Sequence, residues 1–178
     1  MKKSFTLIEL LVVVGLISLI SGTVIGVYLT GIKSQRKILE TQELLNQINY
    51  ALEYMGRAIR MAKKDDIEIG DKTANCCSET KVNYCTSTQE ILFRNSRNQC
   101  QKFYLSGNAI FEEIGGTTSP LTSTTSIKIN FLRFKVEGAR QGDGKQPRVT
   151  ISIEAETRGG RKMKFQTTVS QRDLDVTE

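Results

Sequence analysis

The sequence predicts an α+β protein in which one long N-terminal helix precedes a domain of mainly antiparallel strands. Between Phe5 and Ile32 the only charged side chain is Glu9, whereas almost all of the 25 Lys and Arg and 19 Asp and Glu lie elsewhere in the 178-residue chain. After residue 90, short runs alternate apolar and polar residues, which is the pattern of half-buried strands. One helix followed only by strands indicates a helix packed on a sheet.

The first half of the predicted helix is long enough to cross a membrane. A bilayer core about 30 Å thick needs about 20 apolar helical residues, and Leu10 to Leu29 supplies them. A cleavable signal peptide has an apolar stretch of only about 7–15 residues. The basic leader, residues 1–4, is therefore expected in the cytoplasm, with the globular domain outside it. Three basic residues after the span reduce this charge bias: Lys33, Arg36 and Lys37.

The apolar segment continues into an amphipathic pattern with no Pro between the two. Seven residues form one helical stripe, because after a first interval of seven they recur at steps of three and four: Ile38, Leu45, Ile48, Leu52, Met55, Ile59 and Ala62. We therefore expect one helix from about Thr6 to Lys63. Its membrane or assembly part covers residues 5–32, and the amphipathic part, residues 33–64, begins the globular domain 33–178 and packs on the sheet.

Residues 65–89 show no periodic pattern and are predicted to form a loop. The loop and its flank contain Cys76, Cys77, Cys85 and Cys100, and an even, clustered number of cysteines in an exported domain predicts two disulfides. A bridge between adjacent Cys76 and Cys77 would strain the intervening peptide, so the other two connectivities are favoured and both are open. The absence of histidine and of any C-x-x-C pair argues against zinc, and no metal or cofactor is expected.

Six strands are predicted within one sheet, residues 90–172, separated by turn residues. They are Glu90 to Arg94, Cys100 to Leu105, Ala109 to Ile114, Ser126 to Val136, Arg148 to Thr157 and Arg161 to Gln171. The short Gly-containing link between the last two predicts an antiparallel hairpin.

The segment from Lys2 to Leu11, KKSFTLIELL, closely resembles the leader and cleavage motif of type IV pilins and type II secretion pseudopilins. The resemblance implies a pilin-like fold, cleavage by a prepilin peptidase between Ser4 and Phe5, and methylation of the new Phe5 amine. Ser4 stands where the family usually has Gly. Glu9 corresponds to the acidic residue with which the family engages the N-terminal amine of a neighbouring subunit. A carboxylate in an apolar helix is costly unless paired, which independently marks Glu9 as a functional residue.

Two further segments look like the W-type minor pilins and the J-type minor pseudopilins. They are Leu52 to Ala62 and Phe165 to Arg172, the latter reading FQTTVSQR. The resemblance implies a non-enzymatic minor subunit that takes part in initiation or tip assembly of a fibre. Its partners would be other pilins or pseudopilins, the prepilin peptidase and the assembly platform of a bacterial inner membrane, where the chain waits as a single-pass protein before entering the fibre.

An alternative is an adhesive or DNA-binding pilin. Four clustered basic residues are the candidate polyanion contacts: Arg57, Arg60, Lys63 and Lys64. A solvated helix face is the simpler interpretation of such a cluster, and nucleic acid is the less favoured partner. An enzyme is the least favoured class, because the chain has no histidine to act as a general base and no phosphate-binding loop.

Overall fold

The computed structural model describes residues 6–64, 76–77 and 81–172. The ordered elements are one helix followed by eight strands: α1 Leu7–Arg60, β1 Tyr84–Thr86, β2 Glu90–Arg94, β3 Cys100–Ser106, β4 Ala109–Ile114, β5 Thr117–Pro120, β6 Ile127–Glu137, β7 Arg148–Thr157 and β8 Lys162–Ser170. The chain forms two compact units, Met1–Glu40 and Thr41–Glu178. The predicted α+β class is confirmed, and the leader, residues 1–4, lies outside the described residues.

Helix α1 begins one residue after the predicted start, Thr6, and ends three residues before the predicted end, Lys63. It continues without interruption through its glycines. Hydroxyl groups in the apolar half bond to carbonyls of the preceding turn: Ser18 Oγ to Val14 at 2.8 Å and Thr30 Oγ1 to Gly26 at 2.9 Å. The hydroxyl groups thus find their hydrogen-bond acceptors within the helix and need none outside it, as an apolar environment requires.

The prediction of a single sheet is wrong, because the strands form two antiparallel sheets. Strands β1 to β5 form the first in sequential order, and β6, β7 and β8 form the second. Strand β6 does not continue from β5; instead, the amide of Ile129 donates to the carbonyl of Asn108 in the β3–β4 turn, at 2.9 Å. Alternation along a strand identifies its buried face but not its neighbour, so the sequence pattern did not reveal the break.

Two strands were not predicted. Strand β1 lies within the predicted loop 65–89, and β5 lies in the predicted turn segment between Gly115 and Thr125. All four residues of β5 are exposed, so an apolar alternation was never available to mark it. By contrast β2, β4 and β7 have the predicted bounds, and β7 pairs with β8 in the predicted antiparallel hairpin.

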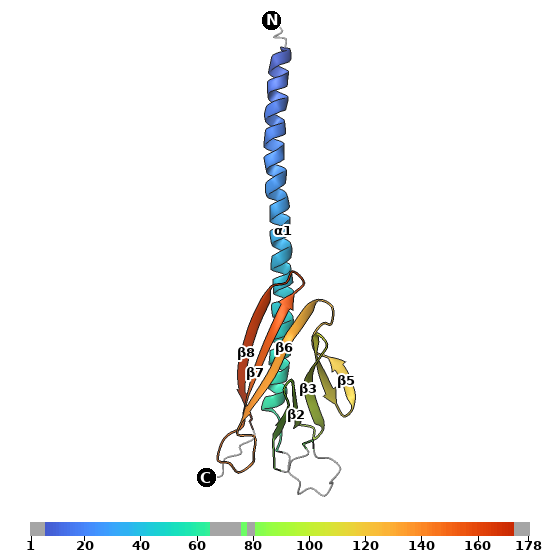
Figure 1. Cartoon of the computed structure of the whole chain (residues 1–178), viewed down its shortest axis with the longest axis vertical. Helices are drawn as coiled ribbons and strands as arrows, with labels where there is room; N and C mark the ends of the chain where they lie inside the picture. The colour runs from blue at the N-terminus through green and yellow to red at the C-terminus, as the bar shows by residue number, and fades with distance from the viewer. Residues whose placement is uncertain (1–5, 65–75, 78–80, 173–178) are drawn as a thin grey trace. The chain divides into compact units, whose positions relative to one another are not determined.

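Within the second unit, the last turns of α1 form one core with both sheets, which lie side by side across this part of the helix (Figure 1). The helical contribution is Leu44, Ile48, Ala51, Met55, Ile59 and the following Ala62. The predicted stripe was partly out of phase: Ile38 is exposed, and Leu45 and Leu52 are only half-buried. Leucines at both 44 and 45 made the two phases indistinguishable by periodicity.

The C-terminal end of α1 is held by segments distant in sequence. The hydroxyl of Tyr84 donates to the carbonyl of Ile59 at 2.8 Å, and the amide of Arg172 donates to that of Arg60, also at 2.8 Å. The last carbonyls of a helix have no partner within it, so these contacts satisfy them. Gly56 permits close approach of β8, because a Cβ at this position would lie 3.3 Å from Val169 Cγ2.

Candidate functional site

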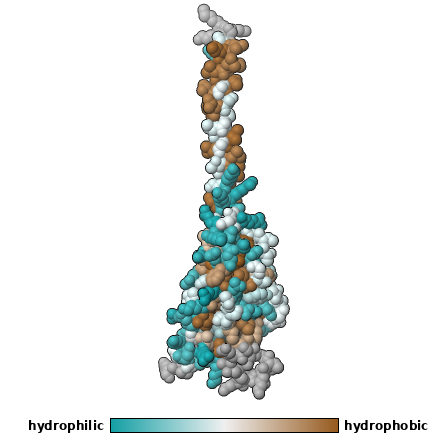
Figure 2. All heavy atoms as spheres, in the orientation of Figure 1, coloured by the Kyte–Doolittle hydropathy of each residue, from teal (hydrophilic) through white to brown (hydrophobic). Residues whose placement is uncertain are grey.

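The N-terminal unit carries a continuous exposed apolar surface on α1. Large apolar side chains from Leu7 to Leu29 are roughly half to four-fifths exposed, and none of the 18-residue window that meets the membrane-span criterion is buried. Brown, hydrophobic atoms gather on this segment in Figure 2. The helix is therefore long and apolar enough to cross a membrane. Because no other part of the described chain covers these apolar side chains, lipid or the helices of other subunits can cover them.

Glu9 turns back on the N-terminus of its own helix. Its Oε2 accepts hydrogen bonds from the backbone amide of Thr6 at 2.9 Å and from the Thr6 hydroxyl at 2.8 Å. Thr6 precedes the first helical residue, so the pair corresponds to half of a capping box, in which the acidic side chain returns to the residue that begins the helix. Because Oε1 makes no hydrogen bond within the described residues, the carboxylate keeps one oxygen for another donor.

The predicted cleavage bond between Ser4 and Phe5, and the predicted methylation at Phe5, lie outside the described residues. Glu9, the predicted assembly residue, lies within the described residues, so its hydrogen bonds can be compared with the prediction. The capping contact was not anticipated, although the spacing T-x-x-E from Thr6 to Glu9 is a sequence signal for it.

The four cysteines form the two predicted disulfides, Cys76–Cys100 and Cys77–Cys85. The bridges connect the two adjacent cysteines to different strands, β3 and β1. Residues 76 and 77 are thereby attached to the first sheet. Within the described residues, no group of three His, Cys, Asp or Glu side chains is placed to hold a metal ion.

The predicted basic cluster lies at the end of α1. Arg57, Arg60 and Lys63 are exposed and Lys64 is half-buried. Arg57 pairs with Glu53 at 3.0 Å, Lys63 Nζ donates to Asn98 Oδ1 at 3.1 Å, and Lys64 also has an interaction partner.

The structure adds a cation that the sequence analysis missed. Arg97, from the β2–β3 turn, lines the same pocket as Arg57 and Tyr54. Arg57 and Arg97 are forty positions apart, and residues 95–99 show no motif, so only the fold places these two arginines at one pocket.

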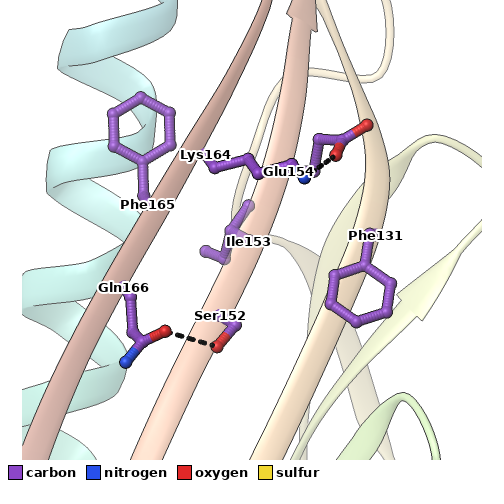
Figure 3. Close-up of a pocket in the computed structure, with 7 residues that line it drawn as sticks. All are labelled: Phe131, Ser152, Ile153, Glu154, Lys164, Phe165 and Gln166. Atoms are coloured by element: carbon purple, nitrogen blue, oxygen red, sulfur yellow. Dashed lines mark hydrogen bonds and ion pairs between the residues drawn. The ribbon is translucent and has the colours of Figure 1, made fainter.

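A second depression, of about 510 Å³, lies over β6, β7 and β8 (Figure 3). Phe131 forms one wall, and the polar side chains on its floor engage one another. Lys164 and Glu154 are 3.5 Å apart, as are Ser152 Oγ and Gln166 Oε1. These contacts are cross-strand pairs that stabilise a sheet surface. Because these polar side chains already bond to one another, few polar atoms of the depression are left to bind a ligand.

Comparison of the sequence with known protein families and with curated proteins finds no match, and comparison with solved structures finds none either.

Proposed function

We propose that this chain is a non-enzymatic structural subunit of a pilus-like fibre, a minor pilin or pseudopilin of the type IV pilus or type II secretion kind. The observation that carries the proposal is Glu9 in an exposed and otherwise uncharged helix surface. The prepilin-like leader that precedes it and the α+β fold of the second unit support the same interpretation.

The Glu9 geometry suggests how two subunits would be held in register. Thr6 orients the carboxylate through Oε2 and leaves Oε1 for a second donor. In the proposed fibre that donor is the methylated Phe5 amine of a neighbouring subunit, produced by cleavage after Ser4. A buried charge is stable only when paired, so the amine and the carboxylate favour the one axial position in which both are neutralised.

Two variants separate this role from capping alone. Glu9→Gln removes the charge and keeps a side chain that can accept from Thr6, whereas Thr6→Ala removes the hydroxyl donor and keeps the charge. The proposal expects Glu9→Gln to reduce incorporation into fibres at least tenfold and Thr6→Ala to reduce it little. The measurement is the amount of each variant in sheared fibres relative to the membrane fraction. Equal incorporation of Glu9→Gln and the unmodified chain would exclude the register role.

Intact-mass analysis of the membrane-extracted protein tests processing. The expected mass is that of a chain beginning at Phe5 with one added methyl group and two disulfides. An uncleaved mass in cells with an active prepilin peptidase would contradict the proposal. Deletion of the gene is expected to abolish or shorten the fibres, and fibres of normal number and length would argue against an initiating role.

The alternative, a surface- or DNA-binding pilin, depends on Arg57, Arg60, Lys63 and Lys64. Phosphate contacts make affinity fall steeply with salt concentration. The test is DNA binding by the full chain at low salt, and no binding there would eliminate this version. Arg57 and Arg60 are exposed on α1, as on an ordinary solvated helix face, and the assembly role is therefore the better supported one.

A further inference from the structure

A pocket of about 340 Å³ lies between the end of α1 and the first sheet. One wall is a helical face with residues at the spacing i, i+3, i+4 and i+7, and the opposite wall is the β2–β3 turn. Together with residues of β3 and β4, the lining is Tyr54, Arg57, Ala58, Met61, Asn95, Ser96, Arg97, Gln99, Gln101 and Ile114. This volume falls within the range of small-ligand sites, about 300–1,000 Å³.

The turn that carries Arg97 is held firmly. Asn95 Oδ1 accepts hydrogen bonds from the amides of Arg97 at 2.9 Å and Gln99 at 3.0 Å. At its base, the amide of Lys63 donates to the carbonyl of Arg94 at 3.0 Å. The turn is thus fastened to the residues after α1, so the two arginine-bearing walls have a defined separation.

Both guanidinium groups are available to a ligand. Arg97 makes no side-chain hydrogen bond or ion pair within the described part of the chain, because it bonds to Asn95 through its backbone amide. Among the residues that the structure describes, Arg57 pairs with Glu53 alone, and both side chains of this pair are about three-quarters exposed. Exposed pairs contribute little and exchange readily. Two arginines that line one pocket suit a carboxylate or a phosphate, because a guanidinium group can bind either of these through paired donors.

The back of the pocket favours an anion of low charge. Tyr54 and Gln101, two lining residues, both donate to the buried carboxyl group of Glu112, at 3.0 Å and 2.6 Å. The negative charge of Glu112 lies directly behind these residues and repels a multiply charged ligand such as a phosphate chain. A single carboxylate can bind the two arginines and is repelled less by Glu112, because it carries only one negative charge.

The pocket also has an aliphatic part beside its polar residues, which favours a peptide over a free ion. Ala58, Met61 and Ile114 contribute aliphatic surface, and Met61 is 41% exposed. We propose that this pocket binds an acidic side chain flanked by aliphatic residues, on an extended segment of a partner protein. The carboxylate lies between Arg57 and Arg97, and a flanking aliphatic side chain covers Met61. The proposal concerns this pocket alone and does not depend on fibre assembly.

Met61 provides the reporter. The full chain in detergent micelles is labelled at the methionine methyl groups, and the Met61 signal is assigned by its loss in Met61→Leu. The probe is the acetylated and amidated peptide Gly-Leu-Glu-Leu-Gly, with Gln in place of Glu as the uncharged match. The Glu peptide is expected to shift the Met61 signal saturably at millimolar concentration, while the buried Met55 does not move. Arg97→Gln and Arg57→Gln each weaken binding at least tenfold.

The matched control is Arg133→Gln, because Arg133 is an exposed arginine of β6 that does not line this pocket. It is expected to bind the Glu peptide as the unmodified chain does. An unchanged Met55 signal in Arg97→Gln verifies folding. Equal shifts with the Glu and Gln peptides, or undiminished binding by Arg97→Gln, would overturn the proposal. Tighter binding of inorganic phosphate or of a single-stranded oligonucleotide at the same site would overturn it in favour of a polyanion site.

Discussion

The side-chain amide of Gln171 donates a hydrogen bond to the main-chain carbonyl of Ala62 across 3.0 Å, although 109 positions separate the two residues. Both are buried, and the contact lies beside the hydrogen bond from the Arg172 amide to the Arg60 carbonyl. The end of the last strand therefore closes the end of the helix. This contact gives a structural reason for the polar residues that follow the distinctive Thr-Thr-Val segment of β8.

Replacing Gln171 with Leu removes this donor and leaves the Ala62 carbonyl without its partner. A lost buried hydrogen bond costs about 1–3 kcal/mol, so we expect the free energy of unfolding to fall by this amount. The measurement is urea unfolding of the full chain in micelles, monitored by near-ultraviolet circular dichroism. Gln89→Leu, at an exposed position just before β2, is the matched control and should change stability by less than about 0.5 kcal/mol.

The phenol of Tyr54 is expected to lose its proton at a higher pH than an ordinary tyrosine. Burial, together with its hydrogen bond to Glu112, raises the pKa of Tyr54 from the ordinary 10.0 to about 12. A raised pKa in the folded state means that the protonated phenol stabilises the fold below about pH 10. That contribution is lost as the pH rises from about 10 to about 12. Absorbance at the tyrosinate band should show a step near pH 12 that Tyr54→Phe reduces by the amplitude of one tyrosine and that Tyr50→Phe leaves unchanged. Titration of all five tyrosines near pH 10 would contradict this.

The two disulfides should differ in their effect on stability because they close loops of different length. Cys76–Cys100 spans 24 positions and Cys77–Cys85 spans 8. Loop-closure entropy then gives about 3.5 and about 2.5 kcal/mol respectively. Paired Ser substitutions should lower the free energy of unfolding in this order. The pairing is checked in Cys85→Ser by alkylating the thiol that is left free and locating it by tandem mass spectrometry. The free thiol is expected at Cys77, and a free thiol at Cys76 would show the pairing to be wrong.

Gly56 should tolerate only a small side chain. An added Cβ meets Val169 Cγ2 at 3.3 Å, so Gly56→Ala trades a tight contact against better helix propensity and should be nearly neutral. Gly56→Leu must push β8 away and is expected to cost about 1–3 kcal/mol. Gly31→Leu is the control, because no atom lies within 4 Å of an added Cβ there. Urea unfolding of the three variants decides the order, and a stable Gly56→Leu would refute the close approach.

Local periodicity was sufficient to locate most elements. The bounds of β2, β4 and β7 follow from alternation along the chain, and the continuity of α1 follows from the absence of Pro and the run of apolar residues. These signals depend on neighbours within one or two turns, so they are complete in the sequence. The same locality explains why the sequence predicted Leu45 as the core residue where the structure buries Leu44. Both leucines fit the helical repeat, and only the position of the sheets decides which one is buried.

The sequence by itself determined that the apolar part of the long helix carries one charged residue, Glu9, and that antiparallel strands follow the helix. Only the tertiary structure decided which cysteines pair, where the second sheet begins, and that Arg97 shares a pocket with Arg57. The physical reason is that helix and strand patterns record which face of an element is buried, whereas partners distant in sequence are selected by packing. The bond from Gln171 to Ala62 is such a choice, because nothing within several residues of either one specifies the other.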